Sequence, residues 1–437
     1  MDEILRTTFF SLIAFITIIL ILAKPYLGVV FTLVSLPVVD LLPPISFLTS
    51  IVIFIGIVTL AGFLFQKLRS SKKSIFNFGS IHIIGLLFVV WILVSNFQAA
   101  WSGENRNWLL TFLQLWALVW LTGELFDSPE KQHVFMWLFS VVSVVAAIIS
   151  IRQGNIGDTI STSTRAIGLA GNPNSTGRYL VVAMVFFSYL GTITNKRLLR
   201  LLAIGGVIVT FLGVFYTLSR TSILLLVAAI VLQNIFNARR KFSYTSVAVY
   251  LIAALVMWFL ASQIVNILQS IVPSILQGTD TVGVRYKLWQ AAWNMWLDHI
   301  FQGVGIGMYP SYLRYYALGL APHYWAEPPH NTYLTALAET GLVGFILFAL
   351  LPVLSLKNFL QSGKIDDTTI NSLRNVWLTV FVVVLLGEIT ANGLYDKLLW
   401  FLFGISVYFR RQFSMRQQEI VEHEQVQHGS MPVLERR

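Results

Sequence analysis

Residues 134–151 read VFMWLFSVVSVVAAIISI, a run without a single charged side chain. A helix needs about 20 apolar residues to cross the hydrocarbon core of a bilayer, which is roughly 30 Å thick. This run is therefore predicted to span a membrane, and similar runs recur along the chain. The spans are expected near 8–23, 26–42, 46–65, 81–98, 108–126, 133–151, 177–193, 201–217, 222–236, 244–262, 333–354, 375–391 and 397–409.

The composition supports membrane embedding of the whole chain. Of its 437 residues, 56% are hydrophobic and 11% are charged, whereas a soluble domain carries about 25% charged residues. We expect an all-α polytopic membrane protein with about 12 or 13 transmembrane helices and one large periplasmic loop that contains short helices. The second span carries Pro37 and Asp40 and is expected to be short, and broken or re-entrant. The predicted units are an N-terminal bundle at 1–262, the loop at 263–332, the C-terminal helices at 333–409 and a cytoplasmic tail at 410–437.

Basic residues orient the predicted spans. Cytoplasmic loops of membrane proteins carry an excess of Lys and Arg. Such residues cluster in alternate loops: Lys67, Arg69, Lys72 and Lys73; Lys196, Arg197 and Arg200; Arg239, Arg240 and Lys241; Lys357, Lys364 and Arg374; Arg410, Arg411 and Arg416. The other loops, including 263–332, are then periplasmic, as expected for a multi-pass protein of the bacterial cytoplasmic (inner) membrane.

Several basic residues nevertheless fall on the predicted periplasmic face. Arg220 lies in YTLSRTS (216–222) between two apolar runs, where a charge is costly and often functional, although it is also compatible with a headgroup contact. Arg285 and Lys287 begin VRYKLWQAAWNMWLD (284–298), whose tryptophans share one helical face and are interpreted as an interfacial anchor. For Arg285 a functional role and an anchoring role remain open.

Three further motifs lie on the same face. The glycines of GVGIG (303–307) are expected to form a tight turn or to allow two backbones to approach. His330 follows two prolines at the mouth of the next span and can titrate near neutral pH, although a lone histidine is usually structural. In the loop before the seventh span, Asn172-Pro173-Asn174 forms a turn, for which a structural role suffices, and Arg165 is a candidate anion contact.

These residues suit one kind of chemistry. A transferase on the outer face needs a donor activated beforehand, such as a lipid-linked sugar diphosphate. Arg220 and Arg285 would bind the departing diphosphate, and His330 would take a proton from an acceptor hydroxyl. The carboxylates on this face show no pattern typical of a divalent-cation site, so neither a metal nor another cofactor is expected.

The whole chain resembles the O-antigen ligase and O-antigen polymerase superfamily of membrane glycosyltransferases. The stretches that carry the resemblance are Arg165 with GNPN (171–174), SRTS (219–222), Arg285 with Trp289 and GVGIG (303–307), and HNTYL (330–334) with ETGLVG (339–344). The resemblance implies an undecaprenyl-diphosphate-linked glycan as donor, and metal-independent, inverting transfer. It implies that Arg220, Arg285 and His330 are catalytic. Candidate substrate-binding residues are Arg165, Asn172, Asn174, Lys287 and Asn331.

The acceptor remains open. A ligase would join the glycan to a lipid A-core sugar, and a polymerase would join it to a growing glycan. Related enzymes glycosylate protein, and no nucleic-acid partner is expected. A polysaccharide-lipid transporter or flippase is the alternative of another class. It predicts charges in the middle of spans, and Glu388 is the one residue that favours it.

Overall fold

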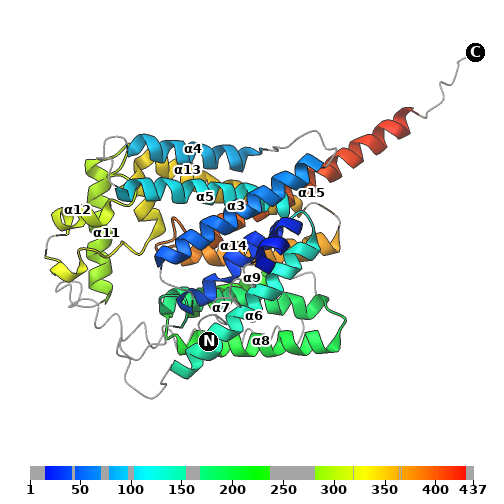
Figure 1. The fold of residues 1–437 in the computed structure, drawn as a ribbon, viewed down its shortest axis with the longest axis horizontal. Coiled ribbons are helices and arrows are strands. Elements are labelled where there is room, and N and C mark those ends of the chain that lie inside the picture. The colour runs from blue at the N-terminus through cyan, green and yellow to red at the C-terminus, as the bar shows by residue number, and fades with distance from the viewer. Residues whose placement is uncertain are drawn as a thin grey trace, which may run out of the picture.

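The computed structural model describes residues 15–41, 45–69, 78–96, 103–153, 168–236, 281–317, 319–363, 365 and 367–429, and within these ranges the chain is helical and has no strand. Figure 1 shows the helices as one long bundle crossed at one end by shorter helices. They are α2 (Tyr26–Val34), η1 (Leu36–Leu41), α3 (Ile45–Arg69), α4 (Ser80–Ser95), α5 (Gly103–Leu125), α6 (Pro129–Gln153), α7 (Pro173–Ile193), α8 (Arg197–Tyr216), α9 (Arg220–Phe236), α11 (Thr281–Asp298), α12 (Tyr309–Tyr316), η2 (Pro322–Tyr324), α13 (Thr332–Ser362), α14 (Thr368–Gly387) and α15 (Lys397–Gly429).

Seven of the described helices are long and apolar enough to cross a membrane, namely α3, α5, α6, α7, α8, α13 and α14. Helices α4 and α9 are also apolar but shorter. The predicted all-α polytopic membrane fold is therefore confirmed. The predicted span at 244–262 and the first part of the span at 8–23 lie outside the described residues, so the total of 12 or 13 helices stays a prediction.

The outer surface of the bundle is apolar, as expected for helices that contact lipid. Helix α8 exposes large apolar side chains such as Leu198, Leu201 and Ile208, which would be unfavourable in water. Helix α7 shows the opposite pattern, because every residue from Thr176 to Phe187 is buried. A helix that is buried on all sides lies in the core of the bundle. Polar side chains on α7 therefore face other helices and not lipid.

The second predicted span is broken, as expected. Helix α2 ends at Val34 and the chain continues as the 3-10 helix η1, which is kinked at Val38. Pro37 lacks a backbone N–H and cannot continue an α-helical hydrogen-bond ladder. The end of η1 is tied to the loop before α7, because the Asp40 carboxylate accepts a hydrogen bond from the Gly171 N–H at 3.0 Å.

Basic residues gather at one end of the bundle. At this end, here called the basic end, Lys67 and Arg411 both pair with Glu124, and Arg410 donates a hydrogen bond to Ser80. These basic residues belong to two different loops that the positive-inside rule assigned to the same side. The opposite end carries α11, α12 and η2 and is called the loop end (Figure 1).

The helices of the loop end have a small apolar core of their own. It is formed by buried side chains of α11, α12 and the first part of α13, including Val284, Leu288, Met295, Leu313 and Ala338. Figure 1 shows α11 running across the end of the bundle and not along it. This orientation agrees with the predicted interfacial helix. The loop end is therefore a packed layer and not an unstructured connection.

The glycine-rich stretch 303–307 packs the layer of α11 and α12 closely against α13. Helix α13 is interrupted at Gly341, where φ is 65° and ψ is −170°. A Cβ at Gly303 would lie 2.4 Å from the Glu339 carbonyl carbon, and one at Gly341 would lie 2.4 Å from that of Phe301. The Gly305 N–H donates to the Glu339 carbonyl at 3.0 Å. The expected close approach of two backbones is thus present, and it explains why glycine occupies these positions.

Candidate functional site

Helix α11 brings Arg285 next to His330. One helical turn after Arg285, the Trp289 indole donates a hydrogen bond to the Pro329 carbonyl at 2.8 Å, directly before His330. The interpretation of the tryptophan face as a membrane anchor is therefore wrong for Trp289, because its N–H is used inside the protein. Trp293 is exposed, as an anchor would be. The helical periodicity of the sequence identified the face that the tryptophans share. It did not show which of them packs against the rest of the protein and which is exposed.

His330 occupies a strained backbone position. Its φ is 50°, in the left-handed region that costs about 1–2 kcal/mol for a residue with a Cβ. The next residue, Asn331, is the N-cap of α13 and accepts hydrogen bonds from the backbone N–H groups of Tyr333 and Leu334, both at 3.1 Å. The turn thus presents the imidazole at the helix start while the cap secures the helix. Strain of this kind is often found at functional positions.

The surroundings of His330 favour its neutral form. Burial lowers the pKa of this histidine, and the nearby positive charge of Arg285 lowers it further. Glu327 acts in the opposite direction, because its Oε2 lies 3.3 Å from His330 Nε2. A neutral ring whose Nε2–H faces this carboxylate keeps a lone pair on Nδ1. At neutral pH the side chain is therefore able to accept a proton at Nδ1.

Arg220 begins α9 after a second strained turn. Leu218 has φ 47°, and among the described residues it and His330 are the non-glycine positions with positive φ. Ser219 stabilises the turn by donating to Asn174 Oδ1 at 2.7 Å, and the Ser222 hydroxyl donates to Ser219 Oγ at 2.8 Å. The Arg220 side chain is exposed, and no hydrogen bond or ion pair joins it to any part of the chain that the structure describes. It is free to bind an anion.

A buried ionic cluster lies between these turns. Arg178 of α7 pairs with both Glu388 and Asp396, and all three side chains are almost fully buried. Glu388 also accepts a hydrogen bond from the Thr332 hydroxyl, at the first residue of α13. This pairing explains Glu388, the residue that favoured a transporter. The sequence offered one indication of this cluster, namely a single carboxylate beside an apolar span. A buried carboxylate of this kind requires a cationic partner.

The segment 388–396 connects the two strained turns. At one side, the Thr332 N–H donates to the Glu388 carbonyl at 3.0 Å, two residues after His330. At the other side, Thr390 donates a hydrogen bond to the Thr221 hydroxyl at 3.2 Å, next to Arg220. His330 and Arg220 are thus held at the same end of the bundle by one segment. The structure brings Arg285 close to His330, and it gives Arg220 no direct contact with either.

The other predicted binding residues have structural partners. Asn172 is the N-cap of α7 and accepts from the Ser175 N–H at 2.9 Å, Asn174 supports the Arg220 turn, and Asn331 caps α13. Lys287 donates to the Gly319 carbonyl at 2.9 Å. Their roles in substrate binding stay predictions, and Arg165 lies outside the described residues.

A small cavity lies behind the His330 turn. It has a volume of about 60 Å³ and is lined by Trp108, Gly307, Pro329, Glu339 and Asn392, among others. Ligand pockets usually measure about 300–1,000 Å³, so this hollow is too small for a sugar. The Glu339 carboxylate accepts a hydrogen bond from the Tyr309 N–H at 3.2 Å and so stabilises the glycine-rich turn.

These observations define an all-helical, multi-pass membrane protein with a histidine, two arginines and a carboxylate gathered at one end of its bundle. Residues 205–349 match a family described as O-antigen ligase, and this segment contains Arg220, Arg285, the glycine-rich turn and His330. This segment of the chain is therefore similar to the O-antigen ligase family. No curated protein matches the chain.

Proposed function

We propose that the protein transfers a glycan from undecaprenyl diphosphate to an acceptor hydroxyl at the loop end, on the periplasmic face of a bacterial cytoplasmic membrane. The observation that carries this proposal is His330, a partly buried histidine between Arg285 and Glu327 whose surroundings lower its pKa. The match of residues 205–349 to the O-antigen ligase family supports the class of reaction.

In the proposed reaction, the acceptor oxygen forms a bond to the anomeric carbon while the bond from that carbon to the diphosphate oxygen breaks. The electron pair leaves with the undecaprenyl diphosphate, and attack from the opposite side inverts the anomeric centre. The hydroxyl proton passes to Nδ1 of His330. A general base of this kind contributes typically about 10²–10⁴-fold to the rate.

Arg285 and Arg220 would stabilise the departing diphosphate. Guanidinium groups bind phosphate oxygens bidentately and remain charged. Binding of the diphosphate would offset the positive charge of Arg285, which otherwise disfavours protonation of His330. The base would therefore gain proton affinity when the donor is bound. Glu327 would stabilise the resulting imidazolium, since its carboxylate lies 3.3 Å from Nε2.

The acceptor is proposed to be a sugar of a lipid A-core, with a growing glycan chain as the second candidate. The single large loop favours the ligase reaction. The pairing of Glu388 with Arg178 gives that carboxylate a structural role, so it no longer argues for a transporter.

The test uses the purified full-length protein in liposomes with a defined undecaprenyl-diphosphate oligosaccharide, in the presence of EDTA. Lipid A-core and glycan acceptors are supplied separately, so that the product identifies the acceptor. We expect His330→Ala and Arg285→Ala to abolish most transfer, and Arg285→Lys to lose activity because lysine cannot bind bidentately. Arg314→Ala is the matched control, since Arg314 is an exposed arginine of the same layer that stacks on Tyr315.

Absence of transfer to every glycan and lipid acceptor by folded protein would refute the enzymatic proposal. Full activity of Arg285→Lys would refute the bidentate role of that arginine. Loss of activity on addition of EDTA, reversed by a divalent cation, would refute metal independence.

A further inference from the structure

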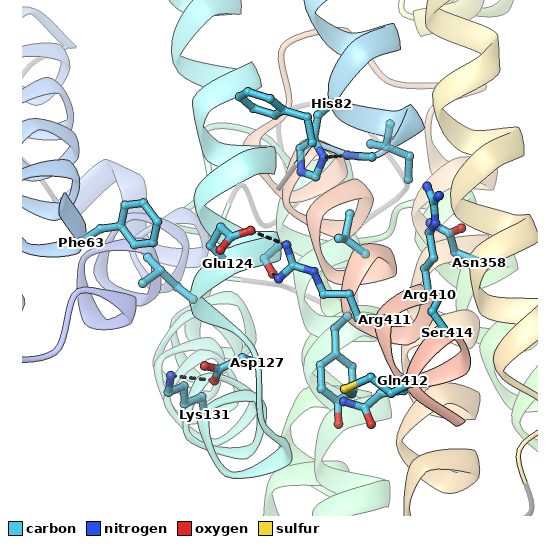
Figure 2. A pocket seen from close by; sticks show the side chains of 18 of the residues that line it. Phe63, His82, Glu124, Asp127, Lys131, Asn358, Arg410, Arg411, Gln412 and Ser414 are labelled. Atoms are coloured by element: carbon cyan, nitrogen blue, oxygen red, sulfur yellow. Dashed lines mark hydrogen bonds and ion pairs between the residues drawn. The ribbon is translucent and has the colours of Figure 1, made fainter. Parts of the chain in front are cut away.

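A large cavity opens at the basic end, on the opposite side of the bundle from His330. Its volume is about 920 Å³, which lies within the range of ligand-binding pockets. Helices α3, α4, α5, α6, α13 and α15 contribute to its walls, together with the turn between α5 and α6. Figure 2 shows the charged side chains that surround it. The proposed glycan transfer does not use this cavity.

The charges that line the cavity are predominantly positive. It is lined by four basic side chains and two carboxylates, and the basic ones are Lys67, Lys131, Arg410 and Arg411. Lys131 pairs with Asp127 at 2.7 Å, and Glu124 is shared by Lys67 and Arg411. These pairs leave an excess of two positive charges. The cavity therefore favours an anionic occupant.

Arg410 is the cation best placed to bind such an occupant. Within the described ranges no carboxylate lies within ion-pair distance of its guanidinium, which donates a weak hydrogen bond to Ser80 at 3.4 Å. Its neighbour Arg411, by contrast, pairs with Glu124 and also donates to the Gly123 carbonyl at 2.6 Å. Figure 2 shows the guanidinium of Arg410 beside the cavity and apart from the Glu124–Arg411 pair.

A buried histidine supplies an unused hydrogen-bond donor to the same cavity. His82 is 1% exposed, and its Nδ1 accepts a hydrogen bond from the Gly79 N–H at 2.9 Å. The proton of the neutral ring is then on Nε2, and this atom has no hydrogen-bond partner among the described residues. His82 lines the cavity, and Figure 2 shows its ring next to the Glu124–Arg411 pair. An unsatisfied buried donor beside a cavity indicates a missing acceptor.

The remaining lining is mixed, because neutral polar side chains such as Gln66, Asn358 and Gln412 stand beside an apolar part. The apolar part of the walls is formed by Phe63, Phe78, Ile81, Val407 and Met415. A site that combines basic groups with apolar walls between membrane helices suits a lipid headgroup whose chains extend into the bilayer. The same basic groups would also bind inorganic phosphate. The chemistry common to both ligands is a phosphate anion that accepts hydrogen bonds from a guanidinium and an imidazole.

We propose that the cavity at the basic end binds a phosphate group through Arg410 and His82 Nε2–H, with Lys67 and Arg411 contributing positive potential. A phosphate oxygen would satisfy the buried imidazole donor, and the guanidinium of Arg410 would bind two further oxygens. The site is distinct from the loop end and requires no glycan.

The test measures binding to the purified full-length protein in detergent by native mass spectrometry. Dioleoyl phosphatidylglycerol, dioleoylglycerol and inorganic phosphate are titrated separately. The two lipids share their acyl chains, but only phosphatidylglycerol carries a phosphoglycerol headgroup. We expect one tightly bound phosphatidylglycerol and an affinity about tenfold lower in Arg410→Gln, because a hydrogen bond to a charged group is lost. The matched control is Arg416→Gln, since Arg416 lies on the same helix, is paired with Glu419 and does not line the cavity.

Two outcomes support the proposal and identify the source of the phosphate. Tight phosphatidylglycerol binding that depends on Arg410 indicates a lipid headgroup, whereas equally dependent binding of inorganic phosphate indicates the free ion. Equal affinities in Arg410→Gln and Arg416→Gln, or dioleoylglycerol binding as tight as phosphatidylglycerol binding, would overturn it. Arg410→Lys guards against a folding defect, because it keeps the charge and is expected to bind with intermediate affinity.

Discussion

Both ends of the bundle pair an arginine with a carboxylate, but the two pairs have different surroundings. At the loop end, the Arg178 side chain is 7% exposed, and its cluster supports the backbone beneath the His330 and Arg220 turns. At the basic end, the Arg411 side chain is 28% exposed and lies beside a cavity. The same type of ion pair therefore has two uses. The buried pair positions backbone, and the more exposed pair forms part of the wall of a cavity. Exposure, and not residue type, distinguishes the two uses.

Breaking each pair gives the largest expected difference between the ends. Arg178→Leu leaves Glu388 and Asp396 buried without their cation, which costs about 3–5 kcal/mol of the free energy of unfolding. Arg411→Leu leaves Glu124 paired with Lys67, so about 1 kcal/mol is expected. Unfolding in mixed micelles measures both values. Equal losses would contradict the distinction between the two ends.

Filling the glycine contacts tests how tightly the loop end is packed. Gly303→Ala places a Cβ 2.4 Å from the Glu339 carbonyl carbon at a residue whose φ is 70°, and we expect a loss of about 2–4 kcal/mol. Gly205→Ala, in α8, meets no atom within 4 Å and is expected to stabilise the protein by up to about 1 kcal/mol. Thermal unfolding compares the two variants. A neutral Gly303→Ala would show that the layer is free to shift.

The pH dependence of transfer tests the charges around His330. Burial and Arg285 lower the pKa of His330 below 6.5, so activity should be high at neutral pH and fall as the ring protonates at lower pH. Arg285→Gln removes a positive charge and should raise the midpoint of this fall, by up to about one pH unit. Glu327→Gln removes a negative charge and should lower the midpoint. Shifts in the opposite directions would refute this arrangement; any residual activity of Arg285→Gln suffices for the measurement.

Replacing a helix N-cap residue should give the smallest loss of stability, and this loss should be equal at the two ends of the bundle. Asn172 caps α7 at the loop end, and Asp367 caps α14 at the basic end. Alanine at either position should cost about 1 kcal/mol. Asn172→Ser should keep both stability and transfer activity if capping is the main role of Asn172. Loss of transfer without loss of stability would instead support the predicted role in substrate binding.

The sequence predicted the seven long apolar helices because hydrophobic runs of this length directly reflect the thickness of a membrane. The break near Pro37 and the close approach at Gly303 also followed from local chemistry. The position of His330 beside Arg285 came from resemblance, and the structure added the contact between Trp289 and Pro329 that explains it. The Arg178 cluster could not be found by periodicity, because Arg178 lies more than two hundred residues from Glu388 and from Asp396 and meets them only through tertiary packing.

The interruption at Gly341 has a mechanical consequence. A continuous helix is a stiff rod, but in α13 the regular ladder of backbone hydrogen bonds is interrupted where the Leu342 N–H bonds to the Ile300 carbonyl at 2.7 Å. The Trp91 indole bonds to the Thr340 carbonyl at 2.8 Å. A tilt of the membrane-embedded part of α13 is therefore not transmitted along one rod to His330. A change in bilayer thickness that tilts the span would act on His330 mainly through the glycine-rich contact. The interruption at Gly341 therefore partly isolates the position of His330 from deformation of the surrounding lipid.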